Sequence, residues 1–119
     1  MSYTSLGKRV CVYISEADRY HHHPLADAIL EAARQEGIAG AAVLRGIEGF
    51  GPSGHLETNR LLSSSDNLPI VVTFVDDQHR IDRLLPILER MVAEGLITEE
   101  TVELQVRRDE KANPLDDDE

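Results

Sequence analysis

The order of two hydrophobic periodicities along the chain restricts its fold more than any other feature. Apolar residues alternate with a period of two over 8–15, 41–50 and 101–107 and run almost unbroken over 68–75, which predicts four β-strands. Helical spacing follows Pro24 and the pair Asp76-Asp77, which predicts one helix after the first strand and another after the third. The order β-α-β-β-α-β indicates a ferredoxin-like α+β fold, in which two helices cover one face of a four-stranded antiparallel sheet.

Both predicted helices are followed by a glycine and then an apolar residue. Gly37 precedes Ile38, and Gly95 precedes Leu96. A glycine in the left-handed conformation followed by an apolar residue is typical of a Schellman ending. We therefore expect the first helix to end near Gly37 and the second near Gly95. Because proline inside a helix removes a hydrogen bond, a bend is also expected at Pro86.

One face of the predicted sheet has no helix to cover it. The third strand is apolar on both sides, and Cys11, Tyr13 and Leu44 fall on the uncovered side. An apolar patch of that size is uncommon on a soluble monomer. The sequence therefore predicts that copies of the chain associate through this face.

Length and charge define the domain organisation. The 119 residues suit one domain, and we expect an N-terminal extension over 1–7, a folded domain over 8–108 and a disordered acidic tail over 109–119. The tail carries six carboxylates and one lysine, which is half of the formal net charge of −10. An acidic chain is expected to bind neither nucleic acid nor an anionic membrane surface.

The sequence also favours the cytoplasm. No apolar run approaches the roughly 20 residues of a membrane span, so direct membrane insertion is not expected. The first residues lack the pattern of a signal peptide. Cys11 is the only cysteine, so no internal disulfide can form.

The connection between the second and third strands is longer than the fold requires. The predicted strands over 41–50 and 68–75 leave about 17 residues between them where a hairpin needs only a short turn, and the flexible loop is expected over 49–67. Gly49, Gly51 and Gly54 allow close backbone approach there. Exposed N–H groups in such a loop can bind an anion. The alternative is a mobile flap that binds no ligand.

Three segments resemble the PII-like proteins grouped as domain-of-unknown-function family 190. They are the run Gly37–Gly51, which contains Arg-Gly-x-x-Gly-Phe-Gly, the segment Ser15–Tyr20 and the strand that begins at Leu68. The resemblance covers about residues 8–107. It implies a homotrimeric signal-transduction protein that binds an adenine nucleotide (AMP, ADP, ATP or cyclic AMP) in clefts between subunits. It further implies that the flexible loop regulates a partner protein, often a membrane transporter.

The resemblance also implies which residues form each site. The nucleotide-binding residues are expected to be Arg45, Gly46, Glu48, Gly49, Phe50, Gly51, Arg107 and Arg108. The partner-contact loop is expected to use Pro52, Ser53, Gly54, His55, Glu57 and Arg60. Arginine suits phosphate oxygens, and an aromatic ring can pack on a purine. The alternatives are an ion pair of Arg45 with Glu48 or a neighbouring subunit, and an exposed strand end for Arg107 and Arg108.

Two departures from the family pattern limit these expectations. Glu57 stands where family members often have a histidine. The segment from Asp76 to His79 lacks the glycines with which nitrogen-regulatory PII proteins hold phosphates. A mono- or diphosphate or a cyclic nucleotide is therefore at least as suitable as ATP.

The main alternative is a trimeric divalent-metal-binding protein similar to CutA. The triplet His21, His22 and His23 would supply imidazole ligands, with Glu16 or Asp18 completing the site.

Catalysis is not expected, and no cofactor is required. Cys11 is predicted to be a buried, inert thiol in mid-strand. The run Ser63-Ser64-Ser65 has no histidine and aspartate at a recognisable spacing. We therefore expect a binding protein and not an enzyme.

Overall fold

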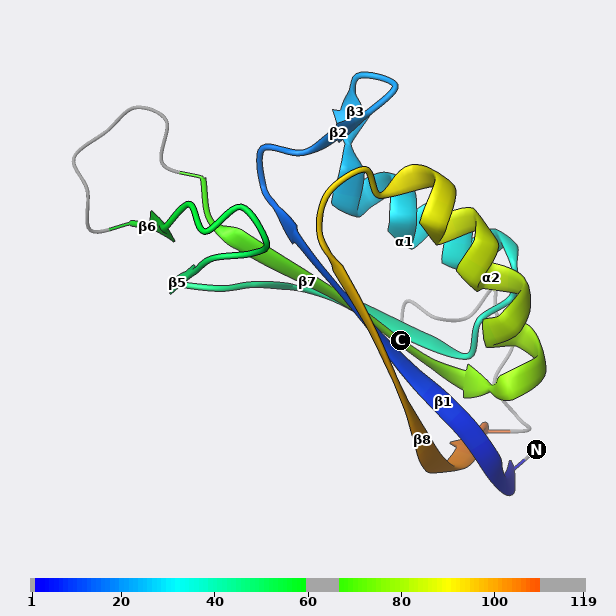
Figure 1. Ribbon diagram of the computed structural model, residues 1–119. Helices are drawn as coiled ribbons and strands as arrows, with labels where there is room; N and C mark the ends of the chain where they lie inside the picture. Colours follow the sequence, from blue (N-terminus) through cyan, green and yellow to red (C-terminus); the bar gives the residue numbers. More distant parts are fainter. Residues whose placement is uncertain (1, 60–66, 110–119) are drawn as a thin grey trace.

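The computed structural model describes residues 2–59 and 67–109. A four-stranded antiparallel sheet has the order β4-β7-β1-β8, and both helices lie on one face of it (Figure 1). The ferredoxin-like α+β fold is therefore confirmed. The sheet strands are β1 (Ser2–Ser15), β4 (Gly40–Arg45), β7 (Pro69–Asp77) and β8 (Leu96–Arg107), and the helices are α1 (Leu25–Gln35) and α2 (Gln78–Met91).

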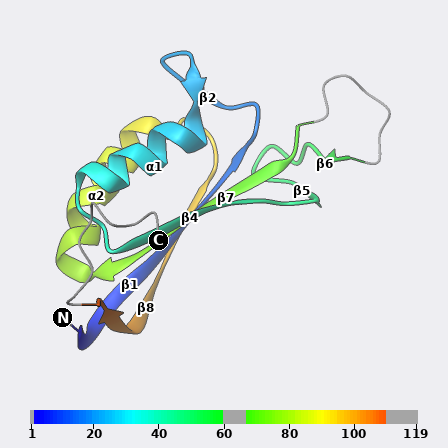
Figure 2. The ribbon, with the colours of Figure 1, turned by 180° about the vertical axis from the view of Figure 1, so that it is seen from behind.

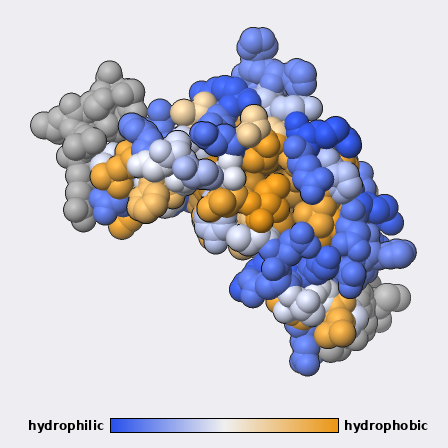
Figure 3. Space-filling view, viewed as in Figure 1, coloured by the Kyte–Doolittle hydropathy of each residue, from blue (hydrophilic) through white to orange (hydrophobic). Residues whose placement is uncertain are grey.

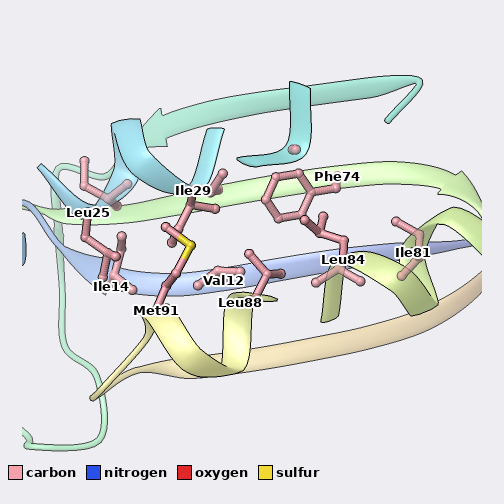
Figure 4. Packing of buried hydrophobic residues seen from close by; sticks show 13 residues of the cluster. Val12, Ile14, Leu25, Ile29, Phe74, Ile81, Leu84, Leu88 and Met91 are labelled. Atoms are coloured by element: carbon pink, nitrogen blue, oxygen red, sulfur yellow. The ribbon is translucent and has the colours of Figure 1, made fainter. Parts of the chain in front are cut away.

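The core lies between the helices and the sheet. Alternate residues of β1 and β7 point toward the helices, among them Val12 and Phe74, both essentially inaccessible to solvent. Figure 4 shows the helix side chains that meet them, which include Ile29 of α1 and Leu84 and Leu88 of α2. The apolar faces of the two helices thus supply the other half of the core.

Strands β1 and β8 are longer than expected. They pair along Ser2–Tyr13 and Leu96–Arg107, so the segment expected as an N-terminal extension is, from Ser2 onward, part of the sheet. The polar residues around Gly7 hid this pairing, because they interrupt the apolar alternation. Glycine is needed there, since a Cβ at Gly7 would lie 2.5 Å from the Asp76 carbonyl oxygen.

The two helices end differently. At the end of α1, Gly37 has φ +74°, and the N–H of Ile38 donates to the Ala33 carbonyl at 3.1 Å, which confirms the Schellman ending. Helix α2 runs through Pro86 but ends at Met91 with an extended Val92, so the same prediction for Gly95 was wrong.

Gly95 has a different role. A Cβ there would lie 2.6 Å from the Tyr13 carbonyl oxygen, so glycine allows the chain to enter β8 close to β1. At the other end of α2, Asp77 caps the helix, because its side chain accepts the Arg80 N–H at 3.0 Å.

The uncovered sheet face is as apolar as the sequence predicts. The register places Cys11 and Tyr13 of β1 opposite Thr73 and Val71 of β7, on the face away from Val10 and Val12. Leu44 lies on the same face and is 56% exposed. The expected acidic tail lies, from residue 110 onward, outside the described residues. Within the described ranges, no helix combines the length and apolar character needed to cross a membrane.

Candidate functional site

The long connection leaves the sheet earlier than expected. Strand β4 ends at Arg45 instead of continuing to Phe50, and the Gly46 N–H donates to the Pro69 carbonyl at 2.8 Å. Because Pro69 has no N–H, it cannot return a bond to extend the ladder. The chain then forms a separate two-stranded ribbon of β5 (Glu48–Gly49) and β6 (Glu57–Thr58), which projects from one end of the sheet (Figure 2).

A cavity of about 740 Å³ lies between this ribbon and the ends of β1 and β7. Its sheet side is formed by Tyr13, Ile14 and Ser15 of β1 and by Pro69, Ile70 and Val71 of β7. Five of the eight expected nucleotide-binding residues line it, namely Gly46, Glu48, Gly49, Phe50 and Gly51. Of the expected partner-contact residues, Pro52, Ser53, His55 and Glu57 line the same cavity, and Arg60 lies outside the described residues.

Two hydroxyl–carboxylate hydrogen bonds shape the ribbon side of the cavity. The Ser15 hydroxyl donates to the Glu57 carboxylate and so ties the ribbon to the end of β1. Within the ribbon, the buried Thr58 hydroxyl donates to Glu48 Oε1 at 2.9 Å. A turn in which the Gly54 N–H donates to the Gly51 carbonyl at 2.9 Å forms the tip between the two strands.

Arg45 lies outside the cavity lining and binds Glu16. Its Nε and one terminal nitrogen lie 2.9 and 3.1 Å from the two carboxylate oxygens of Glu16. Glu16 Oε1 also accepts the Leu68 N–H at 3.1 Å. The Arg45 guanidinium, followed by the Leu68 N–H, holds the pKa of the Glu16 carboxyl below its ordinary value. Arg45 therefore forms an ion pair, as in the alternative to nucleotide binding, but its partner is Glu16 and not Glu48.

Glu16 joins both ends of the long connection to β1, and sequence reasoning missed this role. Arg45 lies at the end of the strand that enters the connection, and Leu68 lies where the chain returns to the sheet. Glu16 belongs to the segment Ser15–Tyr20, one of the three that carry the family resemblance. That resemblance was the available signal, because the sequence alone suggested only a metal ligand.

Within one chain, Arg107 and Arg108 lie at the opposite end of the sheet. Arg107 pairs with Ser2, whereas the cavity lies beside Ser15 at the other end of β1. The two points are about 40 Å apart, since a 14-residue strand rises about 3.3 Å per residue. A single subunit therefore does not bring these arginines to the cavity.

The charged side chains of the cavity lining are almost all acidic. The lining among the described residues contains four carboxylates, one histidine (His55) and no lysine or arginine. Phe50 adds an aromatic ring that is 71% exposed. The four carboxylates belong to Asp18, Glu48, Glu57 and Glu94.

The histidine triplet occupies a tight turn. Strands β2 (Arg19–Tyr20) and β3 (His23–Pro24) form a small hairpin, and its two turn residues, His21 and His22, have φ values of 50° and 71°. In the described part of the chain, no three histidine, cysteine or carboxylate side chains are grouped so that they could hold a metal ion. The CutA-like alternative therefore gains no support.

The two catalytic alternatives gain no support from the described residues either. Cys11 is half-buried on the open sheet face, with its Sγ 3.5 Å from the Thr73 hydroxyl, so the expectation of a buried thiol was wrong. The alternation places Cys11 on the face without helices, which explains the difference. Ser63, Ser64 and Ser65 lie outside the described residues.

Comparison with known proteins gives one family. Residues 7–104 match the DUF190 family, described as "Uncharacterized ACR, COG1993". A UPF0166 protein of Aquifex aeolicus is 32% identical over 97 residues, which cover 82% of this chain and 91% of that protein. The UPF0166 protein of Methanocaldococcus jannaschii is 34% identical over 92 residues, which cover 76% of this chain and 84% of that protein.

Solved structures of PII-like proteins have the same fold. CPII of Thiomonas intermedia K12, a nitrogen regulatory PII-like protein solved with ADP, AMP and bicarbonate, superposes with a TM-score of 0.61 at 15% identity, covering 88% of this chain and 92% of that one. A putative PII-like signalling protein of Thermus thermophilus superposes with a TM-score of 0.56 at 13% identity, covering 87% and 91%.

Proposed function

The chain belongs to the DUF190 family and has the fold of PII-like proteins, and from that premise we propose that it is a regulatory protein that binds an adenine nucleotide. It acts as a homotrimer in the cytoplasm and not as an enzyme. The nucleotide lies between subunits, and its binding changes how the connection over 46–67 fits a target protein such as a membrane transporter.

The cavity beside the glycine-rich connection is the observation that carries this proposal. At about 740 Å³ it falls within the range of small-molecule sites. Its lining combines an apolar floor, an exposed aromatic ring at Phe50 and the closely approaching backbone of Gly46, Gly49 and Gly51. The fold neighbour CPII was solved with ADP and AMP, which supports an adenine nucleotide as the ligand class.

The distribution of arginines supports a site between subunits. Arginine is well suited to binding a nucleotide phosphate, but Arg45 is engaged by Glu16 and the cavity lining of one subunit is acidic. Arg107 and Arg108 are exposed at the far end of β8. A second copy can bring its own Arg107 and Arg108 to the cavity, whereas the same subunit cannot.

The open sheet face supports assembly. Tyr13, Leu44 and Leu96 are exposed on it, and edge strand β4 is exposed along its whole length. Covering this face in a trimer would remove apolar surface from water and would pair an open strand edge.

The target protein would meet the apolar part of the projecting ribbon. Ile47, Phe50 and Leu56 are each more than half exposed. In the space-filling view, apolar side chains gather both on this projecting segment and over the middle of the molecule (Figure 3). The tip of the ribbon, between β5 and β6, consists of Pro52, Ser53, Gly54 and His55. A partner would contact this tip first.

Titration calorimetry with AMP, ADP, ATP and cyclic AMP, together with light scattering, tests the proposal. We expect a trimer and saturable binding of at least one nucleotide. The double variant Arg107→Gln/Arg108→Gln should weaken nucleotide binding at least tenfold, and Arg34→Gln, an exposed arginine of α1, is the matched control. A monomer in solution, or no binding of any of the four nucleotides up to millimolar concentration, would contradict the proposal.

A further inference from the structure

The proposed function leaves open which end of the nucleotide enters the cavity of a given subunit. Its wall contains the Ser15–Glu57 pair, in which the serine hydroxyl donates one hydrogen bond to the carboxylate and accepts another from the Ala17 N–H at 3.1 Å. An ionised carboxylate offers about four acceptor positions. Glu57 can therefore keep its hydrogen bond to Ser15 and still accept hydrogen bonds from a ligand.

The carboxylate-lined side of the cavity does not suit a phosphate group. Glu48 and Asp18 line the cavity together with Glu57. Both are also hydrogen-bond acceptors: Glu48 accepts a hydrogen bond from the Thr58 hydroxyl, and Asp18 accepts one from the Ser15 N–H at 2.9 Å. At pH 7 a phosphate has little to donate, and the carboxylates repel it. Hydroxyl and amino groups donate hydrogen bonds, and both occur at the nucleoside end of a nucleotide.

The rest of the lining suits the same end. Phe50 presents an aromatic ring, and Ile14, Pro69 and Val71 form an apolar floor, a combination that fits a planar base. Carboxylates are also the groups with which proteins bind the vicinal hydroxyls of ribose.

We propose that the cavity of one subunit takes the nucleoside end of the ligand, with ribose hydroxyls donating to Glu57, so that the protein selects ligands with free 2′- and 3′-hydroxyls. The inference rests on the proposed nucleotide binding and narrows its ligand. Nucleoside 5′-phosphates satisfy the requirement, whereas 3′,5′-cyclic AMP does not, because its 3′ oxygen is esterified.

Calorimetry on the full chain with AMP, 2′-deoxy-AMP, 3′-deoxy-AMP and cyclic AMP tests the selection. A hydrogen bond to a charged group contributes enough that each missing hydroxyl should weaken binding by about tenfold or more. Equal binding of AMP and its deoxy analogues would overturn this inference while leaving the proposed function intact, and no binding of AMP or any other adenine nucleotide would overturn both.

Two variants separate contact with the ligand from tethering of the ribbon. Glu57→Gln should weaken AMP about tenfold but leave 2′,3′-dideoxy-AMP within about twofold, because that analogue has no hydroxyl to donate. Ser15→Ala removes the tether but keeps the carboxylate, so the ratio of AMP to dideoxy-AMP affinity should stay as in the unmodified protein. If Glu57→Gln weakens both ligands equally, Glu57 acts through the fold and the inference fails.

Discussion

Replacing Glu16 by glutamine should loosen the base of the long connection at both ends. The carboxylate holds Arg45 through contacts of 2.9 and 3.1 Å and accepts the Leu68 N–H at 3.1 Å. Glutamine has nearly the same shape and keeps one carbonyl oxygen for Leu68, but it loses the charge and one acceptor oxygen toward Arg45. The change therefore isolates the ion pair.

The expected loss of stability is modest. The Glu16 side chain is 34% exposed and that of Arg45 is 58% exposed, so water screens the pair. Its contribution to the free energy of unfolding should therefore lie near the upper end of the range for surface ion pairs. We expect Glu16→Gln to lower the free energy of unfolding by about 1 kcal/mol at pH 7. Glu16→Ala should lower it by about 2 kcal/mol, because the Leu68 N–H then also loses its acceptor.

The effect should depend on pH in one direction. Since the pKa of Glu16 in the folded protein lies below its ordinary value of 4.5, the folded state binds the proton more weakly than the unfolded state. The stabilisation is therefore complete above about pH 4.5 and is lost as the pH falls through the lower, folded value. The difference between the unmodified protein and Glu16→Gln should shrink over this range.

Urea unfolding at one fixed protein concentration measures these differences, and exchange of the Leu68 amide proton reports on the connection itself. Glu31→Gln is the matched control, because Glu31 forms a pair of exposed side chains with Arg34 at 3.6 Å and should change stability by less than about 0.5 kcal/mol. A double-mutant cycle with Arg45→Gln should give a coupling near about 1 kcal/mol. If Glu16→Gln is as stable as Glu31→Gln and Leu68 exchanges no faster, Glu16 does not hold the connection.

Three further substitutions test other parts of the fold by the same unfolding assay. Leu84→Ala should lower stability by about 2–5 kcal/mol, because Leu84 is fully buried between α2 and the sheet, and a smaller loss would mean that the core closes over the cavity. Gly7→Ala should lower it by more than about 1 kcal/mol, since the new Cβ would lie 2.5 Å from the Asp76 carbonyl oxygen, and unchanged stability would show that β1 and β7 separate easily there. His22→Gly should raise it by up to about 1 kcal/mol because φ is 71° at that turn position, and a decrease would indicate that the imidazole makes a stabilising contact.

The sequence predicts the layers of this fold better than the limits of its strands. Apolar periodicity identified both helices and the face that each one buries, because the spacing of apolar residues follows the buried face of a helix. It did not find the first part of β1, where Lys8 interrupts the row of apolar residues that face the helices and the strand is recognised by its pairing with β8. It also extended β4 beyond Arg45, since the end of that ladder depends on Pro69 in another strand.

The sequence identified the segment that lines the cavity but not the side-chain contacts around it. The motif Arg-Gly-x-x-Gly-Phe-Gly marked the segment that forms the cavity, and its glycines and Phe50 do line it. The partner of Arg45 could not be found from spacing, because Glu16 is 29 residues away and reaches it only through the pairing of β1, β7 and β4. Side-chain partners of this kind follow from the sheet order and not from sequence distance.

If the proposed function is correct, the length of β1 and β8 links ligand binding to assembly. The strand pair that carries Arg107 also begins beside the cavity, and its extended backbone fixes the separation of the two within one subunit at about 40 Å. A ligand whose base lies in the cavity of one copy and whose phosphate meets Arg107 and Arg108 of another must bind the assembled form more tightly than the separate chain. In the proposed trimer, binding therefore stabilises the assembly by mass action, so that covering the open face and filling the cavity favour each other.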